Sequence, residues 1–390
     1  MRNYNKKNCR LCKGPLAFNP LIRLENVPRE GQLFPNSKQI VSDYGMSLAL
    51  YRCNQCSLVQ LCGEPVVYRD SETSATGFSP SMMRHRKEQA YRFVEYFNLR
   101  DKKVIEAGCG DGHFLTLLLE AGARPFGIEP SRKFTERCRE QGLSVEPGEV
   151  SDSLKNSPFD AFATIHVLEH VPDPNSFLQG IYKNLIAGGG GFIEVPSFEK
   201  ILEGKRFYNL ILDHLSYFTV NTLRFTLEKN NFKVLDIKRD WEGEHIIALV
   251  KKQEPGNIAP RQPRERLGEF SGWVEPLKNR INNFTQGFKR VAIWGAGAEG
   301  VSLIAVTGLR GVAYVVDSAP YKQGRFTPVN HFPIVHPRTL KTDPVDAIII
   351  AAPRYYREII RQLKEDIKFK GTIALLKGNT LDIIARVLKI

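Results

Sequence analysis

The stretch VIEAGCGDGHF, residues 104–114, decides the fold expected for this chain. A short apolar run ends in an acid, three glycines follow at alternate positions, and an apolar helical pattern then begins. This is the order of a buried strand, a glycine loop and a helix. Because glycines permit positive φ angles and a close backbone approach to a ligand, the loop predicts a ligand site at the end of a strand.

The segments around this loop continue the alternation of strand and helix. A short polar helix pattern, SRKFTERCREQG, follows the second strand. Strands are predicted at 103–107, within 123–131 and ending at Glu129, in 159–170 where a strand runs into a loop, within 188–197, and at 232–240 and 244–252. The last two read as a pair that closes the sheet. We therefore expect a doubly wound α/β domain whose ligand lies at the carboxyl ends of its strands.

Two acids beside the glycine loop indicate what the loop binds. Glu129 stands 17 residues beyond Gly112, at the end of the next strand, where acids of dinucleotide-binding folds accept ribose hydroxyls. NAD is therefore one candidate ligand. Glu106 directly precedes the glycines, and a carboxylate there repels a pyrophosphate but attracts a cation. A sulfonium with an amino-acid tail fits that second requirement.

Length and composition place these elements in a protein of two or three domains. The chain has 390 residues, with 42% hydrophobic and 25% charged residues, which is typical of globular proteins. Its net charge of +13 is scattered along the chain and suits nucleic acid, an anionic membrane or a phosphorylated small molecule. No nucleic-acid-reading motif, membrane-spanning run or signal peptide is visible, so we expect neither of the first two partners and a cytoplasmic location.

Four of the seven cysteines form two C-x2-C pairs. Cys9 and Cys12 lie in CRLC, and Cys53 and Cys56 lie in CNQC, with 40 residues between the pairs. Two such pairs can complete a tetrahedral four-sulfur zinc site with no open coordination position. We expect structural zinc; free thiols and a redox dithiol are the alternatives, and Cys62 is a rival ligand.

The last third of the chain repeats the strand, glycine loop and helix pattern after a linker rich in proline and charge at 251–268. Gly295, Gly297 and Gly300 form a G-x-G-x-x-G, and the next strand ends in Asp317. This is the pattern of a dinucleotide-binding unit, so NAD is a candidate here too. About four parallel strands are expected, however, which is fewer than a full dinucleotide fold contains.

The central segment resembles class I S-adenosylmethionine-dependent methyltransferases. VIEAGCGDGHF is similar to their first motif, GIEPS to their second, and FDAFATIHVLEHVPDPNSFL to the segment following their fourth strand. The resemblance implies S-adenosylmethionine as cofactor. It places Gly108 and Gly110 along the methionine part, Glu129 on the ribose, and His166 and Val167 beside the cofactor.

The layout of the whole chain resembles zinc-knuckle sugar-nucleotide C-methyltransferases. YRCNQCSLVQL is similar to their second knuckle, and IWGAGAEG and VVDSAPYKQGRFTPVNHFPIVHP to their C-terminal signature. The resemblance implies a nucleotide-sugar substrate, specifically a keto-deoxysugar, and three domains: zinc-binding at 1–66, methyltransferase at 67–252 and Rossmann-like, substrate-binding at 253–390. Lys322 and Arg325 are then candidates to contact the diphosphate, with solvated loop charges as the alternative.

The stretch NLILDHLSYFT, residues 209–219, reads by itself as the end of a buried helix that carries an ionisable pair. The family has Tyr-His-Glu-His before Leu-Ser-Tyr-Phe, and its last histidine acts as general base. The resemblance implies that His214 is the base and that Asp213 orients it; the alternative is a core histidine bonded to a backbone carbonyl. Ile211 and Leu212 replace the family's tyrosine and first histidine.

Methylation at carbon requires an enolate, formed when a base removes the proton next to a ketone, and a neutral histidine suits that task. The absent tyrosine leaves the enolate oxygen without its usual donor. His170, Tyr217, Tyr68 and His85 are the candidate replacements, the first three as substrate contacts. An O- or N-methyltransferase needs a base but no enolate donor, so it stays an alternative, as does an NAD-dependent oxidoreductase.

Overall fold

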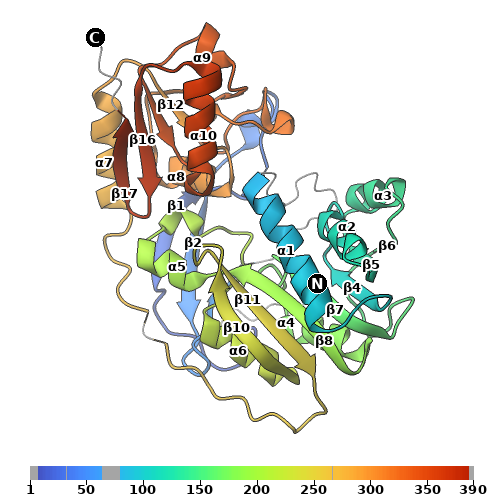
Figure 1. Ribbon diagram of the computed structural model, residues 1–390. Coiled ribbons are helices and arrows are strands. Elements are labelled where there is room, and N and C mark those ends of the chain that lie inside the picture. Colours follow the sequence, from blue (N-terminus) through green and yellow to red (C-terminus); the bar gives the residue numbers. More distant parts are fainter. Residues whose placement is uncertain (1–7, 32, 64–79, 266, 386–390) are drawn as a thin grey trace. The chain divides into compact units, whose positions relative to one another are not determined.

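A computed structural model describes residues 8–31, 33–63, 80–265 and 267–385 (Figure 1). The chain forms two compact units. The first comprises 1–19, 51–198 and 214–266, and the second comprises 20–50, 199–213 and 267–390. Each unit contains a sheet flanked by helices, so the expected α/β fold class is confirmed. The three-domain boundaries stay a prediction.

The first unit is built on a seven-stranded sheet of order β10-β11-β8-β7-β4-β5-β6. The strands β8, β7, β4, β5 and β6 run parallel to one another. The strands β11 and β10 complete the sheet in antiparallel pairing. The bounds are β4 Lys103–Ala107, β5 Arg124–Glu129, β6 Val145–Pro147, β7 Phe159–Ile165, β8 Leu185–Pro196, β10 Phe232–Asp240 and β11 His245–Lys252. The strands predicted around the glycine loop are therefore present.

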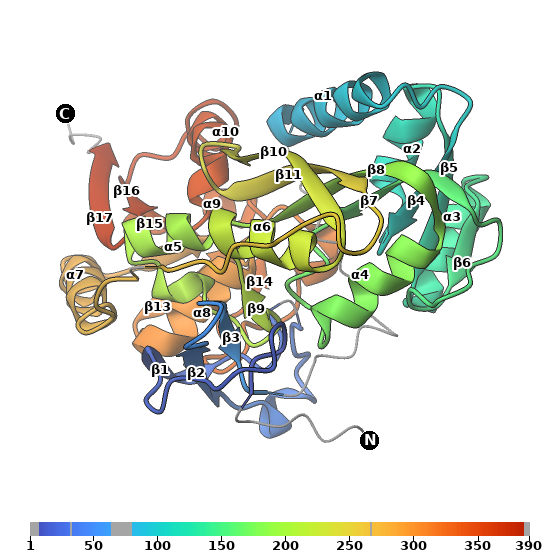
Figure 2. The ribbon, with the colours of Figure 1, turned by 90° about the horizontal axis from the view of Figure 1, so that it is seen from below.

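Helices cover both faces of this sheet because successive strand residues point to opposite sides. Val104 packs with α1 and α2 side chains such as Phe93 and Leu118, whereas Ile105 packs in the cluster that holds Leu178 of α4 and Leu223 of α6. Figure 2 shows these helices above and below the strands. Their bounds are α1 Pro80–Tyr96, α2 His113–Glu120, α3 Arg132–Glu140, α4 Pro174–Lys183 and α6 Val220–Lys229.

The strand order places the ligand-binding edge of this sheet. From β4 the chain continues to β5 on one side, and β7 pairs with β4 on the other. Doubly wound sheets bind ligands at such a reversal, outside the carboxyl ends of the strands. The glycine loop that follows β4 and the segment that follows β7 both begin at this position.

The second unit contains a six-stranded sheet of order β14-β13-β12-β15-β16-β17, parallel except for β17. The expected four parallel strands are present, with two further strands at the edges. The bounds are β12 Val291–Trp294, β13 Val312–Val316, β14 Ile334–Val335, β15 Ala347–Ile350, β16 Thr372–Lys377, β17 Thr380–Ala385, α7 Glu275–Gln286, α8 Ala298–Thr307, α9 Thr339–Thr342 and α10 Tyr356–Gln362. This unit also holds the pairing of β1 (Ile22–Val27) with most of β2 (Met46–Arg52).

The stretch 209–219 is not the end of a helix, so that first interpretation is wrong. The helix α5 (Phe198–Gly204) ends before it, and a short strand, β9 (Ser216–Tyr217), pairs with β3 (Val59–Leu61). The N–H of Leu215 donates to the carbonyl of Glu169, which fixes an extended backbone. Among the described residues, none of the helices is long and apolar enough to cross a membrane.

Candidate active site

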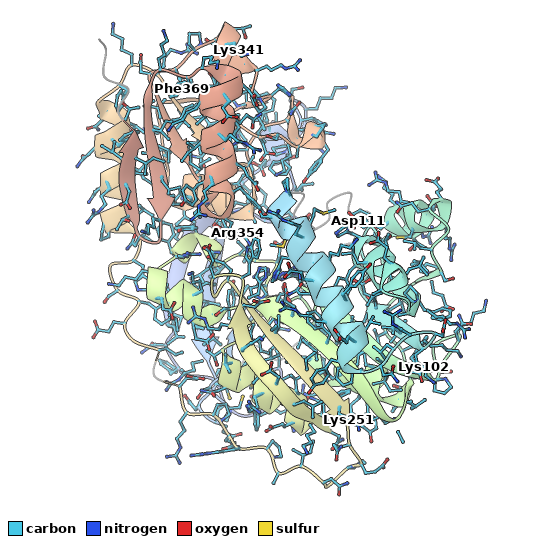
Figure 3. All side chains as sticks on the ribbon, in the orientation of Figure 1. Lys102, Asp111, Lys251, Lys341, Arg354 and Phe369 are labelled. Atoms are coloured by element: carbon cyan, nitrogen blue, oxygen red, sulfur yellow. The ribbon has the colours of Figure 1, made fainter. Side chains whose placement is uncertain are left out.

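The glycine loop after β4 is shaped for close approach to a ligand. Gly108 and Gly110 have φ angles of +78° and +53°. A Cβ on Gly108 would lie 2.5 Å from Cγ2 of Val167, so only glycine fits against this valine. The loop therefore packs on the segment after β7, as the sequence resemblance implied for Val167. Asp111, which follows Gly110, is labelled in Figure 3.

Glu129, at the end of β5, is tied to the same loop. Its Oε2 accepts the N–H of Gly110 at 2.9 Å, and its Oε1 accepts the N–H of Ser131 at 2.8 Å. Each carboxylate oxygen can accept more than one hydrogen bond, so capacity for ribose hydroxyls remains. One backbone contact thus sets the distance between the glycine loop and its acid.

Glu106 is a buried acid with unmet bonding capacity. It is 3% exposed, and its Oε2 lacks a hydrogen-bond partner among the described residues. Burial, with Asp111 close by, raises the pKa of Glu106 well above its usual value. A ligand ammonium group would meet both the bonding and the charge requirement of this carboxyl.

A dense cluster of histidines and carboxylates occupies the carboxyl ends of β7 and β8. His166 follows β7, with a φ angle of +54°, and its Nε2 lies 3.0 Å from Oε1 of Glu194 in β8. His245, at the start of β11, places its Nδ1 2.8 Å from the same oxygen. Arg86 of α1 pairs with Oε2 of Glu194 at 2.7 Å. A non-glycine residue in left-handed conformation here is typical of a functional site.

The cluster continues to His214 through Glu169 and His170. Oε1 of Glu169 lies 3.4 Å from Nδ1 of His166 and 3.8 Å from Nε2 of His170. The rings of His170 and His214 are 4.8 Å apart between centroids, and those of His214 and Tyr217 are 6.0 Å apart. The structure therefore brings together the predicted base and two of its predicted substrate contacts.

Burial and neighbouring charges separate the protonation states of these groups. Burial, together with the ring of His170, lowers the pKa of His214 to about 3, so this imidazole is neutral at pH 7. Burial similarly lowers the pKa of His245 to about 4. Burial alone would raise the pKa of Glu169, but the imidazole of His166 outweighs this effect and lowers the pKa of Glu169 to about 2. His214 is therefore an unprotonated acceptor beside a charged carboxylate.

The remaining predicted residues have other surroundings. Oδ1 of Asp213 accepts the N–H of Gly31 at 3.0 Å. Lys322 is buried and pairs with Asp317 at 3.2 Å, whereas Arg325 is exposed. Nε2 of His85 lies 3.2 Å from Oδ2 of Asp240, and Tyr68 lies outside the described residues.

The four predicted zinc ligands converge. Sγ of Cys9 lies 3.5 Å from that of Cys56, Sγ of Cys12 lies 3.4 Å from that of Cys53, and all four atoms lie within 4.8 Å of one another. With Zn–S bonds of about 2.3 Å, sulfurs of a tetrahedral site stand roughly 3.8 Å apart. The donor set and spacing fit zinc, and Cys62 is not in the group.

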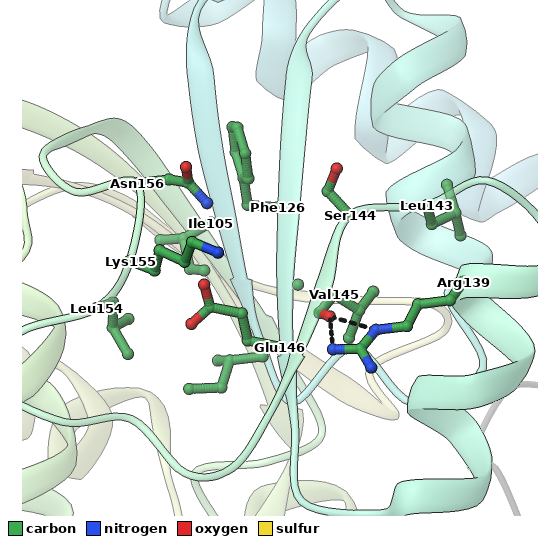
Figure 4. Close-up of a pocket in the computed structure, with 12 residues that line it drawn as sticks. Ile105, Phe126, Arg139, Leu143, Ser144, Val145, Glu146, Leu154, Lys155 and Asn156 are labelled. Carbon is green, nitrogen blue, oxygen red and sulfur yellow. Dashed lines mark hydrogen bonds between the residues drawn. The ribbon is translucent and has the colours of Figure 1, made fainter.

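A cavity of about 270 Å³ lies beside β5 and β6 and does not include any predicted site residue (Figure 4). Its one guanidinium, that of Arg139, donates from Nε and Nη2 to the carbonyl of Val145, at 3.1 and 2.9 Å. Lys155, which is exposed, is a second cation that lines the cavity. None of the lining residues belongs to the cofactor site described above.

Sequence reasoning missed half of the histidine and carboxylate cluster. Glu169 had been read only as part of a motif, and Glu194 and His245 only as strand residues. A usable signal existed for Glu194, because a lone acid inside the apolar run FIEVP must find a partner when buried. Arg86 and Gln89, on the helix before the glycine loop, supply that partner.

Comparisons with known proteins agree with this geometry. Residues 82–237 match the family described as methyltransferase domain, and residues 262–376 match that described as C-methyltransferase C-terminal domain. C-methyltransferase NovU of Streptomyces niveus is 25% identical over 397 aligned residues, covering 93% of each chain. The chain is an S-adenosylmethionine-dependent methyltransferase. The activity class expected from the sequence is thereby confirmed.

Other relatives resemble only part of the methyltransferase. Ubiquinone biosynthesis O-methyltransferase of Methylococcus capsulatus is 35% identical over 110 residues, which are 26% of this chain and 46% of that protein. The part of this chain that aligns thus spans less than half the length of that relative. Magnesium protoporphyrin IX methyltransferase of Synechocystis PCC 6803, solved with bound SAH, is 15% identical with a TM-score of 0.37, covering 48% of this chain and 91% of that one.

The contact between Gly108 and Val167 predicts a selective loss of cofactor binding. We expect Gly108→Ala to weaken S-adenosylhomocysteine binding at least about tenfold, because the new Cβ must displace Val167 and the loop. Gly142→Ala is the matched control, since Gly142 also has a φ of +78° but nothing lies within 4 Å of its Cβ position. Titration calorimetry measures both; equal affinities in the two variants would contradict the close-approach role.

Proposed function

We propose that this methyltransferase transfers a methyl group from S-adenosylmethionine to a ring carbon of a keto-deoxysugar carried on a nucleoside diphosphate. The observation that carries the proposal is the neutral, half-buried His214 beside His170 and Glu169 at the ligand edge of the sheet. Similarity to a C-methyltransferase over 93% of the chain, and to a C-methyltransferase C-terminal domain, supports carbon as the acceptor.

In this proposal the cofactor lies along the glycine loop. Gly108 and Gly110 admit its methionine part, Glu106 takes the ammonium group, and Glu129 accepts the ribose hydroxyls. The unpartnered oxygen of Glu106 supports the contact with the ammonium group. His166 and Val167, which follow β7, border the cofactor on the other side of the loop.

His214 is the proposed general base. A ring nitrogen of His214 takes the proton from the carbon next to the ketone, and the enolate carbon then attacks the sulfonium methyl in line. The products are a C-methylated sugar nucleotide, S-adenosylhomocysteine and a protonated His214. The carboxylate of Glu169 offsets the new positive charge, because it is ionised and lies in the same group. Asp213 orients the base, His170 and Tyr217 contact the sugar, and Tyr68 is a further proposed contact. Arg325, which is exposed, faces the diphosphate, and Lys322 reaches it only when its ion pair with Asp317 opens.

We also propose zinc at Cys9, Cys12, Cys53 and Cys56, with a structural role. The converging thiols support it. Arg10, inside the first pair, is 7% exposed and donates to the carbonyls of Leu61 and Pro172, which ties the knuckle to the rest of the first unit. A four-sulfur site leaves no position for substrate, so the metal supports folding rather than catalysis.

An NAD-dependent reaction is disfavoured by the second glycine loop. Oδ2 of Asp317, the acid that would hold a ribose, already accepts the N–H of Ala296 at 2.8 Å and pairs with Lys322 at 3.2 Å. A dinucleotide would have to replace an internal ion pair that is largely buried. The C-terminal unit is therefore proposed to hold substrate.

The deciding experiment is a panel of nucleoside-diphosphate keto-deoxysugars incubated with a methyl-labelled donor, with NMR of the product. We expect the label on a carbon-bound methyl; label on oxygen or nitrogen would support the alternative acceptors instead. A parallel thermal-shift series compares S-adenosylhomocysteine with NAD. Stabilisation by NAD alone would refute the proposal.

A further inference from the structure

The group formed by His166, Glu194 and His245 lies outside the roles proposed so far for base and zinc. These residues come from three strands or strand ends, β7, β8 and β11, which are far apart in the sequence. Nε2 of His166, Oε1 of Glu194 and Nδ1 of His245 all lie within 4.8 Å of one another. The shared oxygen of Glu194 stands 3.0 Å and 2.8 Å from the two nitrogens.

Two of these three atoms still lack a hydrogen-bond partner among the described residues. Oε1 of Glu194 and Nδ1 of His245 are buried and have no hydrogen-bond partner in the described part of the chain, although they lie close together. Glu194 is 0% and His245 3% exposed, so water does not satisfy them from bulk solvent. Two ring nitrogens and a carboxylate oxygen that converge in this way form a donor set that a metal ion can bind.

The charges around the group leave room for a cation. Two acids, Glu169 and Glu194, are buried in or beside this group, and Arg86 is the guanidinium that pairs with Glu194. Two carboxylates against one guanidinium leave one negative charge in a buried site, and such a charge is costly unless it is balanced. Either a proton on His166 or a bound cation balances it.

The surrounding contacts orient the three donors. Arg86 and Gln89 bind Oε2 of Glu194 at 2.7 and 2.8 Å, which turns Oε1 toward the histidines. On the far side of the His166 ring, Nδ1 faces Oε1 of Glu169 at 3.4 Å. A carboxylate behind a histidine ligand is the arrangement that fixes tautomer and raises basicity in metal sites.

We propose that His166 Nε2, Glu194 Oε1 and His245 Nδ1 bind one divalent transition-metal ion. Two imidazoles and one carboxylate favour ions such as Zn²⁺ or Fe²⁺ over Mg²⁺ or Ca²⁺, which prefer oxygen ligands. Three protein ligands leave an open coordination position, unlike the four-cysteine group. Glu169 is a positioning residue for His166. The neighbouring group of Glu169, His170 and His214 is looser, with 3.8 Å between Glu169 and His170.

The site deepens the proposed function and, in its chemical role, rests on it. It lies at the carboxyl ends of β7 and β8, next to the base, and the chain has Ile211 where the related family has an enolate-stabilising tyrosine. A metal with an open position is a Lewis acid that can stabilise an enolate oxygen. The metal thus offers the charge that the missing hydroxyl does not.

The test uses Co²⁺ as a probe of the full-length protein that carries one zinc per chain, at the four cysteines. After equilibrium dialysis without substrate, we expect one additional Co²⁺ per chain, with the visible spectrum of nitrogen and oxygen ligation and no sulfur charge-transfer band. His245→Asn and His166→Asn should each weaken this binding at least about tenfold, and Glu169→Gln by about 10- to 100-fold. His336→Asn, an exposed histidine in the second unit, is the matched control and should bind as the native chain does.

Absence of the additional Co²⁺, or unchanged affinity in both histidine variants, would overturn the metal site. Circular dichroism and the melting temperature without ligand verify that each variant is folded. His166→Asn serves if His245→Asn fails this check because His245 is the more deeply buried. The two proposals fail separately. Cobalt binding without methylation of any sugar nucleotide refutes only the proposed function, and methylation without cobalt binding refutes only the metal site.

Discussion

His214→Ala is expected to lower the rate of methyl transfer by about 10²- to 10⁴-fold, the range lost when a general base is removed. The side chain is half-buried beside His170 and Glu169, and its neutral form carries the lone pair that the proposed proton removal requires. Cofactor affinity should stay near its native value, because none of the described contacts of the glycine loop involves this residue. Single-turnover kinetics with labelled donor, alongside calorimetry with S-adenosylhomocysteine, measures both effects.

Exchange of the substrate's carbon-bound hydrogen with deuterated water gives a second measurement that does not need methyl transfer. His214→Ala should abolish this exchange, and His336→Ala should leave it unchanged. Native turnover in the His214 variant would return this histidine to a purely structural role. The depressed pKa also sets a pH expectation: above its folded pKa of about 3 His214 stays neutral, so its protonation does not reduce activity between pH 8 and about 5.

Cys53→Ser is expected to remove zinc and most of the folded protein with it. The four thiols converge across two distant segments, and structural zinc contributes apparent binding energies of about 10–16 kcal/mol in small zinc domains. A serine hydroxyl cannot supply the thiolate. We therefore expect loss of bound zinc, a strongly lowered melting temperature and a low yield of folded protein, measured by metal analysis and circular dichroism.

Cys62→Ser is the matched control for that variant. Cys62 lies near the second pair in sequence but is not in the converging group, so its substitution should preserve zinc content. Zinc retained at native stoichiometry in Cys53→Ser would contradict the four-sulfur site. Zinc lost equally in both variants would mean that Cys62, the rival ligand, takes part.

The parts of this fold that could be predicted from sequence are those with strong local signals. The run from Val104 to Phe114 carries strand, turn and helix chemistry in consecutive residues, and the strand ending at Glu129 repeats it. The C-x2-C pairs are equally local, and their convergence needed only the chemistry of zinc. The closing strands, 232–240 and 245–252, followed from their apolar and polar alternation.

The parts that could not be predicted depend on distant residues. The stretch 209–219 was misread as helix because its apolar content matches a buried helix, whereas pairing of β9 with β3 and of Leu215 with Glu169 imposes an extended path. Likewise, His245 and Glu194 meet only because β11 pairs with β8, with His245 opposite Pro196. Such register is a property of the assembled sheet and is absent from either segment alone.

The ion pair between Lys322 and Asp317 affects which metabolites can bind at the second glycine loop. The second glycine loop has the spacing that dinucleotides recognise, yet its acid is neutralised by a lysine five residues further on. Lys322 thus already takes up the carboxylate of Asp317, which the ribose of a dinucleotide would need. NAD and its relatives, abundant in any cell, should therefore bind poorly to the C-terminal unit, which is the unit proposed to hold the sugar nucleotide.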